Sequence, residues 1–467
     1  MNQTVAVQPD RPSRRSKRLD GLLHRAYSQS TKTRFFFIRR IRPAGIGLAL
    51  VLIVATGISV GHQRKSVYQL FSLTFAMGLI SLPWVFLRNA KIHDHRQIPR
   101  YGTAGETLSY TIRATNAGKR TVSHAWLSET PPDPRPNLAD FRHSREPGED
   151  ERNWFDRSLA YYRWQWLINS RRLFEGGHTL EPLSLAPGET KSFSVKITPL
   201  RRGVSKLEDL RVVLPDPFGL LQRCRRTNTE TSTLTVLPKR YRLPAIEMPG
   251  STQFQVGGDA ATNTIGSSGE FVGLRDYRPG DPLRQIHWKS WARTGRPVVK
   301  ELEDTYFPRY GLILDTFANA NADNLFEDAV SVAASFVVTL DKEDSLLDLM
   351  FIKDTAHVVT AGRGFARAEK LLEVLAGVTS ESETDFEQLS QLVIRHREEL
   401  TSCLVVLCGW DEARAEFVQS LERGGIICAV IVIGNGERPN GVPGHWLESG
   451  FIERDLRRMP SHLRSNL

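Results

Sequence analysis

Two stretches decide the fold: AGIGLALVLIVATGISVG runs from Ala44 to Gly61, and VYQLFSLTFAMGLISLPWVFL runs from Val67 to Leu87. Neither contains a charged residue, and only the short segment HQRKS separates them. Each is long enough to cross a bilayer core of roughly 30 Å as a helix. A helix of a globular domain normally keeps a polar face, which these stretches lack. The sequence therefore predicts a two-span transmembrane hairpin over residues 43–87.

The charge around this hairpin predicts its orientation. Residues 1–42 hold eleven Lys and Arg against two acidic residues, and the loop between the spans adds only Arg64 and Lys65. The positive-inside rule then keeps the basic tail, residues 1–42, in the cytoplasm, and two spans return the rest of the chain there. A cleaved signal peptide is the alternative for the first span, and it leaves residues 88–467 on the same side. We expect a multi-pass protein of the cytoplasmic (inner) membrane.

Composition narrows the class of protein. With 40% hydrophobic and 24% charged residues in 467, the chain is neither wholly disordered nor collagen-like. The net charge of +10 comes almost entirely from the basic tail, which argues against a nucleic-acid-binding domain and favours contact with anionic lipid. The four cysteines form no CxxC motif, so we expect reduced thiols in the cytosol.

Residues 88–240 have the pattern of a β-sandwich. Leu108, Tyr110, Ile112 and Ala114 alternate with polar residues, as in a strand buried on one face. An insertion over residues 131–177 is polar but rich in Trp, Tyr and Phe. Either it is a helical insertion whose rings pack on the sandwich, or its aromatic side chains rest on lipid headgroups or a partner. Residues 241–268, rich in Gly, Ser and Thr, are expected to be a linker.

Residues 304–435 change to an α/β pattern. Continuous apolar runs at residues 312–314, 346–352, 404–407 and 426–433 are typical of parallel strands buried on both faces. Helical periodicity separates these runs, so we predict a doubly wound α/β domain, followed by a C-terminal tail over residues 436–467. The whole chain is thus expected to be multidomain.

The segment of residues 269–303 is the densest in charged and aromatic residues. Its turn signal Pro279-Gly280-Asp281 separates arginines from acids, which allows bidentate ion pairs. Its candidate interaction or structural residues are Arg275, Asp276, Tyr277, Gly280, Asp281, Arg284, His287, Trp288, Lys289 and Arg293.

The order of these residues resembles the bacterial domain-of-unknown-function-58 family, whose members are similar to membrane-anchored partners of MoxR-type AAA+ ATPases. The resemblance extends to the hairpin, to a β-domain ending in the segment DPFGL at residues 216–220, and to a von Willebrand A-like C-terminal half. His287 stands where family members often have Asp, so a role that rests on an acid there is not carried over. The resemblance implies an interaction or scaffold protein that works with a MoxR-type AAA+ ATPase in remodelling or maturing a client.

Two alternatives follow from single residues. Asp281 and His287 offer an acid/base pair for an enzyme, but no nucleophile motif accompanies them, and we expect no enzymatic activity. Asp315 follows the first apolar run, where von Willebrand A domains bind Mg²⁺ through an Asp-x-Ser-x-Ser pattern. Here Phe317 and Asn319 replace the serines, so we expect no cofactor and a partner for Asp315 in the backbone or an arginine. A Mg²⁺-dependent ligand-binding module that uses Asp315 is the alternative function.

The chain has no phosphate-binding loop of the Walker type, so any ATP-driven work would depend on a partner. The expected partners are the lipid bilayer and a MoxR-type ATPase, with no nucleic acid. Neither the client nor the oligomeric state follows from the sequence.

Overall fold

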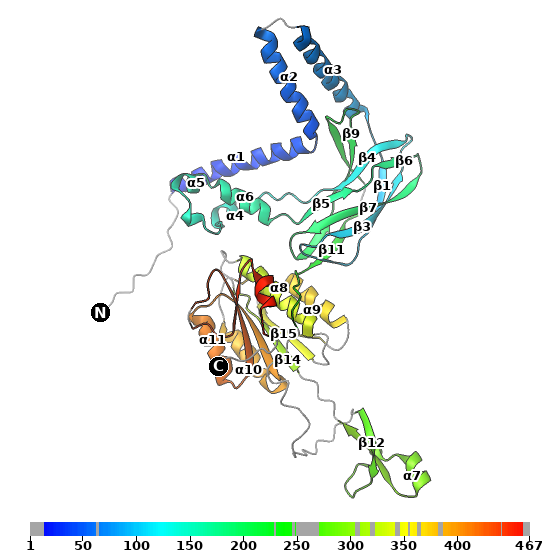
Figure 1. Cartoon of the computed structure of the whole chain (residues 1–467), viewed down its shortest axis with the longest axis vertical. Helices are drawn as coiled ribbons and strands as arrows, with labels where there is room; N and C mark the ends of the chain where they lie inside the picture. The colour runs from blue at the N-terminus through cyan, green and yellow to red at the C-terminus, as the bar shows by residue number, and fades with distance from the viewer. Residues whose placement is uncertain are drawn as a thin grey trace, which may run out of the picture. The chain divides into compact units, whose positions relative to one another are not determined.

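A computed structural model describes residues 14–61, 65–227, 230–244, 248, 270–303, 309–317, 323–340, 346–353, 355–361, 366–381, 386–439 and 441–460. The chain divides into two compact units, one built mainly from residues 1–240 and the other mainly from residues 241–467 (Figure 1). The first contains the apolar helices and a sheet-rich domain, and the second a mixed α/β domain. Most of the expected linker, residues 241–268, lies outside the described residues.

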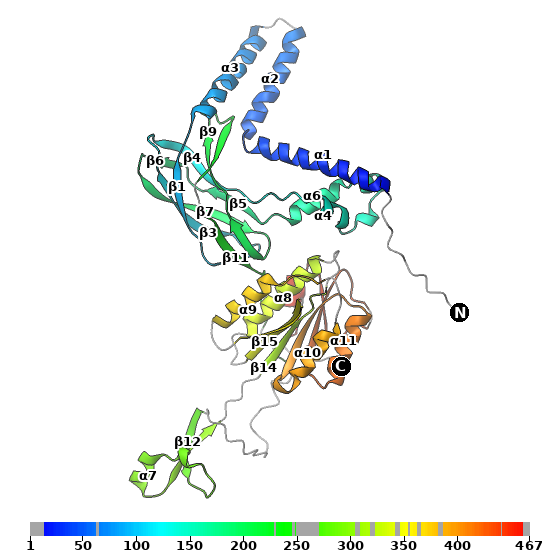
Figure 2. The ribbon, with the colours of Figure 1, turned by 180° about the vertical axis from the view of Figure 1, so that it is seen from behind.

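Two apolar helices, α2 (Pro43–Gly61) and α3 (Lys65–Leu87), lie side by side in both ribbon views (Figures 1 and 2). Within the described residues, one helix is long and apolar enough to cross a membrane, Val67–Leu87, and a shorter apolar stretch, Pro43–Ile58, precedes it. The structure thus supports association with a membrane through one candidate span, where the sequence predicts two.

The N-terminal segment differs from the expected tail, because α1 (Arg14–Ile38) is a helix of 25 residues. A short turn joins its end to the start of α2, and the two helices run in different directions (Figure 1). Leu23 and Tyr27 of α1 pack against Phe141 and Trp164 of the aromatic insertion, and Trp164 donates a hydrogen bond to Thr31. Contacts with residues more than a hundred positions away in the sequence therefore order this basic segment.

The insertion forms α4 (Leu138–His143), the 3-10 turn Glu149–Glu151, α5 (Trp154–Leu159) and α6 (Tyr161–Ser170). Its buried rings make a small cluster with α1, so the expected packing on the sandwich is wrong. Other rings point to solvent: Trp154 is 76% exposed and Phe155 is 60% exposed. The insertion is thus helical as expected, but its buried rings pack on α1, and Trp154 and Phe155 remain exposed.

Eleven strands in two main sheets make the sheet-rich domain. The larger sheet has the order β1-β3-β7-β5-β4-β9-β10, with β6 paired to β4, and the smaller has the order β2-β11-β8. Their bounds are β1 (Ile92–Gln97), β2 (Tyr101–Thr103), β3 (Leu108–Asn116), β4 (Val122–Glu129), β5 (Phe174–Thr179), β6 (Leu183–Leu185), β7 (Thr190–Pro199), β8 (Gly203–Leu207), β9 (Leu210–Pro215), β10 (Gln222–Arg226) and β11 (Ser232–Leu237).

Both sheets contribute to one hydrophobic core. Tyr110, Ile112 and Ala114 of β3 point into it as the alternation predicts, and Leu234 and Val236 of β11 join them from the smaller sheet. The turn after β3 is closed by the side chain of Asn116, which accepts a hydrogen bond from the amide of Gly118.

The mixed α/β domain contains a six-stranded sheet with the order β16-β15-β14-β17-β18-β19. All neighbouring strands are parallel except β16, which pairs antiparallel with β15 at the edge. The strands are β14 (Arg309–Leu314), β15 (Leu346–Lys353), β16 (Thr355–Ala361), β17 (Ser402–Cys408), β18 (Cys428–Gly434) and β19 (His445–Glu448). The helices are α8 (Asp323–Leu340), α9 (Ala366–Gly377), α10 (Phe386–Arg395), α11 (Glu412–Arg423) and α12 (Ile452–Arg457), with a 3-10 turn at Arg397–Glu399.

The four predicted apolar runs lie in β14, β15, β17 and β18, each buried along most of its length. The sheet continues past the expected boundary at residue 435, because β19 pairs in parallel with β18. Residues 436–460 are thus not a separate tail. Helices α10 and α11 pack on this sheet through Phe386, Leu389 and Phe417.

Candidate functional site

The segment singled out by its charged and aromatic residues folds as a small hairpin, which we call the signature hairpin (residues 270–303). Strands β12 (Glu270–Asp276) and β13 (Val298–Glu303) pair antiparallel, and the connection carries a 3-10 turn (Leu283–Gln285) and α7 (Trp288–Thr294). Among the described side chains of the hairpin only Ile286, Val298 and Val299 are buried. A core of this size leaves much of the fold to polar contacts.

An ion pair holds the loop of the signature hairpin. Both terminal nitrogens of Arg275 donate to the carboxylate of Asp281, each over 2.7 Å. The amide of Arg278 donates to the same carboxylate over 2.8 Å, and Gly280 provides the positive φ of 109° that the turn requires. The hydrogen bonds from Arg275 and Arg278 lower the pKa of Asp281 from its ordinary 3.8 to about 2. The Arg–Asp pairing that the sequence suggested is therefore present at one pair.

The other candidate residues of the segment do not join this pair. Arg284, Lys289 and Arg293 are exposed, as is Asp276, and the amide of Tyr277 donates to the carbonyl of Pro297. Arg284 and Arg293 form no ion pair with a carboxylate among the described residues.

His287 has a structural place at the start of α7. Its carbonyl accepts from the amides of Ser290 and Trp291, and Nδ1 lies 2.6 Å from the hydroxyl of Ser290. Asp281 and His287 thus each have other partners and share no hydrogen bond in the described structure. The geometry does not assemble the acid/base pair that the enzyme alternative needs.

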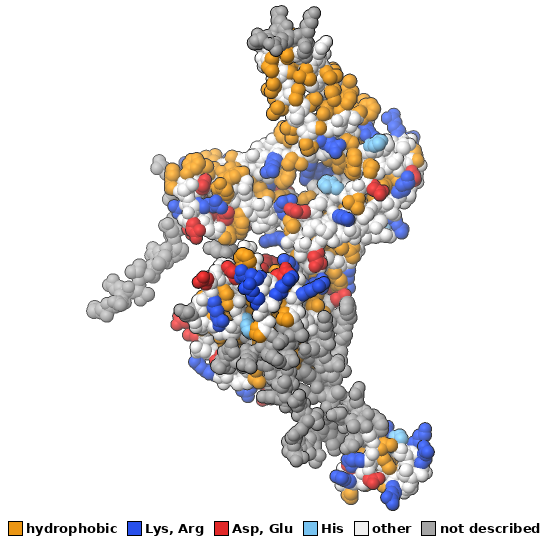
Figure 3. All heavy atoms as spheres, viewed as in Figure 1, with side chains coloured by type: hydrophobic (Ala, Val, Ile, Leu, Met, Phe, Trp, Pro, Cys, Tyr) orange, Lys and Arg blue, Asp and Glu red, His pale blue; other side chains and the backbone are white. Residues whose placement is uncertain are grey.

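The exposed face of the signature hairpin is apolar at its centre and basic around it. Trp288 is 63% exposed and stacks on Trp291 with ring centroids 5.2 Å apart, and Leu283 is 67% exposed. Figure 3 shows Lys and Arg side chains around apolar ones on this module. Exposed Trp and Leu residues cost free energy in water and are typical of binding surfaces.

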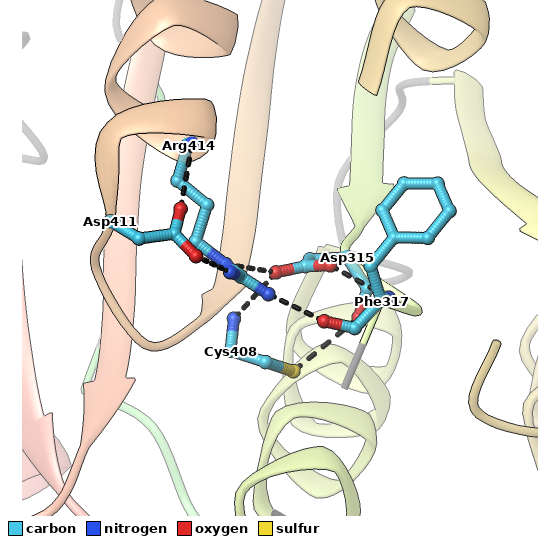
Figure 4. Close-up of polar contacts among 5 residues, drawn as sticks. All are labelled: Asp315, Phe317, Cys408, Asp411 and Arg414. Atoms are coloured by element: carbon cyan, nitrogen blue, oxygen red, sulfur yellow. Dashed lines mark hydrogen bonds and ion pairs between the residues drawn. The ribbon is translucent and has the colours of Figure 1, made fainter. Parts of the chain in front are cut away.

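Asp315 lies directly after β14 and is completely buried. Its carboxylate accepts from the amide of Phe317 over 2.8 Å, the amide of Cys408 over 2.9 Å and Nε of Arg414 over 2.8 Å (Figure 4). Burial raises the pKa of Asp315, while Arg414 and the two amides act in the opposite direction. The partner expected for Asp315 in the backbone or an arginine is thus present in both forms.

This donor set does not suit a hard divalent cation, which binds carboxylate, hydroxyl and water oxygens. A guanidinium already compensates the charge of Asp315, and the hydroxyl of Thr316 donates to the carbonyl of Ile352. Asn319 lies outside the described residues. Across the described parts of the chain, no three His, Cys, Asp or Glu side chains gather as a metal site would require.

The segment DPFGL at residues 216–220 joins the sheet-rich domain to the apolar helices. Asp216 is buried, and its carboxylate accepts from the hydroxyl of Ser81 in α3 over 2.5 Å and from the amide of Leu221 over 3.0 Å. The carbonyl of Leu220 accepts from the amide of Arg42, just before α2. A Cβ at Gly45 would lie 2.3 Å from that carbonyl, so only glycine permits this approach. Sequence reasoning missed this junction, because nothing in the motif itself indicates its partner in the helices.

Comparison with known proteins agrees with the motif. Residues 273–434 match the family described as "Protein of unknown function DUF58". This region of the chain belongs to the DUF58 family. YeaD of Bacillus subtilis (strain 168), described as an uncharacterized protein, is 25% identical over 185 residues, which cover 40% of this chain and 45% of YeaD. The chain thus matches less than half the length of this curated relative.

Two solved structures resemble parts of this chain. The CARDB domain of PF1109 from Pyrococcus furiosus is 11% identical with a TM-score of 0.17, and covers 32% of this chain and 97% of that domain. An aerotolerance-related membrane protein from Bacteroides fragilis NCTC 9343 is 9% identical with a TM-score of 0.19, and covers 33% of this chain and 89% of that protein. At TM-scores this low, neither likeness defines the fold of this chain.

Proposed function

We propose that this DUF58 protein is a membrane-anchored interaction protein that docks a partner on its signature hairpin. The observation that carries the proposal is the exposure of Leu283 and Trp288 on a hairpin whose loop is held by the pair of Arg275 and Asp281. Apolar anchors inside a rim of cations fit a partner surface with an apolar groove and acidic edges.

The family resemblance supplies the class of partner, a MoxR-type AAA+ ATPase. In this proposal α2 and α3 form a two-span anchor, both chain ends are cytoplasmic, and the α/β domain is a von Willebrand A-like platform for the hairpin. The ATPase would supply the energy for remodelling or maturing a client. An Mg²⁺-dependent version of the platform, and an enzyme based on Asp281 and His287, are less favoured because the contacts of these residues are already satisfied.

The experiment is a crosslinking capture from native membranes with the full chain. We compare the intact protein with the double variant Leu283→Ser, Trp288→Ala. Both side chains are exposed, and the substitutions leave the pair of Arg275 and Asp281 in place. The matched control is Trp154→Ala with Phe155→Ala, which removes equally exposed apolar side chains from α5.

We expect a MoxR-type ATPase to be captured by the intact protein and by the control, and to be reduced by about tenfold or more with the hairpin variant, as for the loss of an interface hot spot. Equal capture by all three proteins would place the contact elsewhere. Capture of no ATPase by the intact protein would contradict the choice of partner.

A further inference from the structure

A cavity of about 1280 Å³ lies within the first unit, at the end of α3 that faces the sheet-rich domain. Its walls come from α1, the C-terminal turn of α3, the proline-rich segment of residues 130–135, α6 and the region of β8 to β10. Eleven Lys and Arg residues line it, against three acidic residues. We call it the juxtamembrane cavity.

Much of this positive charge is not neutralised by the protein. Asp133 pairs with Arg135, and Asp209 pairs with Arg211 and Arg226, so two of the three carboxylates are already occupied. Within the described structure, seven lining cations have no carboxylate in ion-pair distance: Lys32, Arg34, Arg39, Arg40, Lys206, Arg223 and Arg225. The cavity is therefore a site of net positive charge.

Several guanidinium groups converge on one wall of the cavity. Burial raises the pKa of the Cys224 thiol, and Arg211, Arg39 and Arg40 act against this effect through their charges. The thiol itself contacts the carbonyl of Arg39 over 3.1 Å. Guanidinium groups that approach the same point repel one another unless an anion lies between them, and their planar donors match the oxygens of a phosphate.

Apolar side chains of α1 and α3 line the same cavity. Leu82, Val85 and Phe86 of α3 line the cavity together with Phe36 and Ile38 of α1. Phe86, Phe36 and Ile38 are also about half exposed or more, at 71%, 49% and 56%. The cavity thus combines cations with exposed apolar side chains, and the guanidinium of Arg40 lies over the ring of Phe36, 4.0 Å from its centroid. This combination suits an amphiphile.

The cavity also lies at the depth where headgroups would be found. The start of α2 and the end of α3 meet the sheet-rich domain through the bridge between Ile41 and Leu221 and through the hydrogen bond from Ser81 to Asp216. Arg223, another lining residue, donates to the carbonyls of Phe86 and Arg88 at the end of α3. The cations are therefore fixed at the end of the membrane-crossing stretch, where the hydrocarbon core gives way to phosphates.

We propose that the juxtamembrane cavity binds an anionic phospholipid, with the phosphate among Arg34, Arg39 and Lys206 and an acyl chain along Leu82 and Phe86. This site depends on association with the membrane and not on the partner proposed for the signature hairpin. A bound lipid would bridge α1 to the sheet-rich domain and complete the wall that the protein leaves positively charged.

The test uses the full chain, purified in detergent and placed in nanodiscs of phosphatidylcholine with or without phosphatidylglycerol. Retained lipid is identified by native mass spectrometry, and affinity is measured with a fluorescent phosphatidylglycerol. The test variant is Arg34→Ala, Arg39→Ala, Lys206→Ala. The control is Arg113→Ala, Lys119→Ala, Lys196→Ala, which removes the same charge from exposed positions of the sheet-rich domain outside the cavity.

We expect the intact protein and the control to retain phosphatidylglycerol, and the cavity variant to bind it about tenfold more weakly or worse. An equal loss of phosphatidylglycerol binding in both variants would overturn the proposal, because binding would then depend on the total charge of the protein and not on the cavity. Retention of no anionic lipid by the intact protein would do the same.

A separate arm distinguishes the lipid from free phosphate. Millimolar inorganic phosphate and glycerol phosphate are added to the nanodiscs, and we expect neither to displace phosphatidylglycerol, since the acyl contacts are absent from both. Displacement by inorganic phosphate would assign the cavity to a soluble anion instead. If the triple variant does not fold, Arg34→Ala and Lys206→Ala are measured singly, with a loss of about threefold expected for each and no loss counting against the site.

Discussion

Two aspartate–arginine pairs of this protein have nearly the same geometry and opposite surroundings. Asp281 lies 2.7 Å from Arg275 in the signature hairpin, where the two side chains are 14% and 35% exposed. Asp315 lies 2.8 Å from Arg414 in the α/β domain, where the values are 0% and 8%. Water and salt screen the first pair and barely reach the second.

Because of this difference, Arg275 only braces a loop, whereas Arg414 is required to compensate a buried charge. Loss of Arg275 would return Asp281 to water at small cost, whereas loss of Arg414 would leave the charge of Asp315 buried without compensation. The exposed pair organises a loop that presents Leu283 and Trp288, and the buried pair ties the end of β14 to α11. A buried tie in the α/β domain and an exposed brace in the signature hairpin are thus built from the same two residue types.

The largest expected effect comes from Arg414→Ala. It should lower the free energy of opening of the α/β domain by about 3–5 kcal/mol, because the Asp315 carboxylate would stay buried without its counterion. Hydrogen exchange of the amides of Leu312 to Leu314 in β14 measures this opening.

The matched control for that variant is Arg423→Ala, on the same helix α11. Arg423 is exposed, and within the described residues its side chain donates a hydrogen bond to Gln419, so its loss should cost at most about 0.5 kcal/mol. Equal effects from the two variants would show that Arg414 does not compensate Asp315 in the way that the geometry indicates.

A smaller and purely local effect is expected from Arg275→Ala. Protection of the Arg278 amide should fall, since this amide donates to the carboxylate that Arg275 holds in place. The opening of β14 should not change. Hydrogen exchange of the peptides covering both regions gives the two results in one experiment. Arg293→Ala is the control, since Arg293 has no carboxylate partner among the described residues. An equal loss of protection in the control would show that Arg275 does not hold the loop in place.

The same contrast explains what the sequence could predict. Apolar runs such as those of β17 and β18 predict buried parallel strands directly, because burial on both faces leaves no other pattern. The edge strand β16 and the short strand β19 were missed, since edge positions place fewer demands on residue type. The basic segment of residues 1–42 was expected to be a tail, because the aromatic residues that order α1 lie far away in the sequence.

The candidate site follows the same rule. Asp281 and Arg275 are six residues apart across a turn, so local chemistry was enough to suggest their pairing. The expectation of an arginine for Asp315 was confirmed. Which arginine it is could not be predicted, because Arg414 lies 99 residues further along the chain and reaches Asp315 through the pairing of β14 with β17. The juxtamembrane cavity draws on α1, α3 and β10, whose proximity no local pattern reveals.

The smallest expected effect is a pH dependence confined to the signature hairpin. The pKa of Asp281 is lowered to about 2, so the stabilisation from its hydrogen bonds is present in full above its ordinary value of 3.8 and is lost as the pH falls through about 2. Exchange of the Arg278 amide, corrected for its intrinsic rate, should therefore lose protection between pH 4 and pH 2. In Arg275→Ala this change should move toward pH 4, because the carboxyl regains a more ordinary pKa. A transition at the same pH in both proteins would mean that Arg275 does not set the ionisation of Asp281, and the exposed pair would then be a contact without a function in the loop.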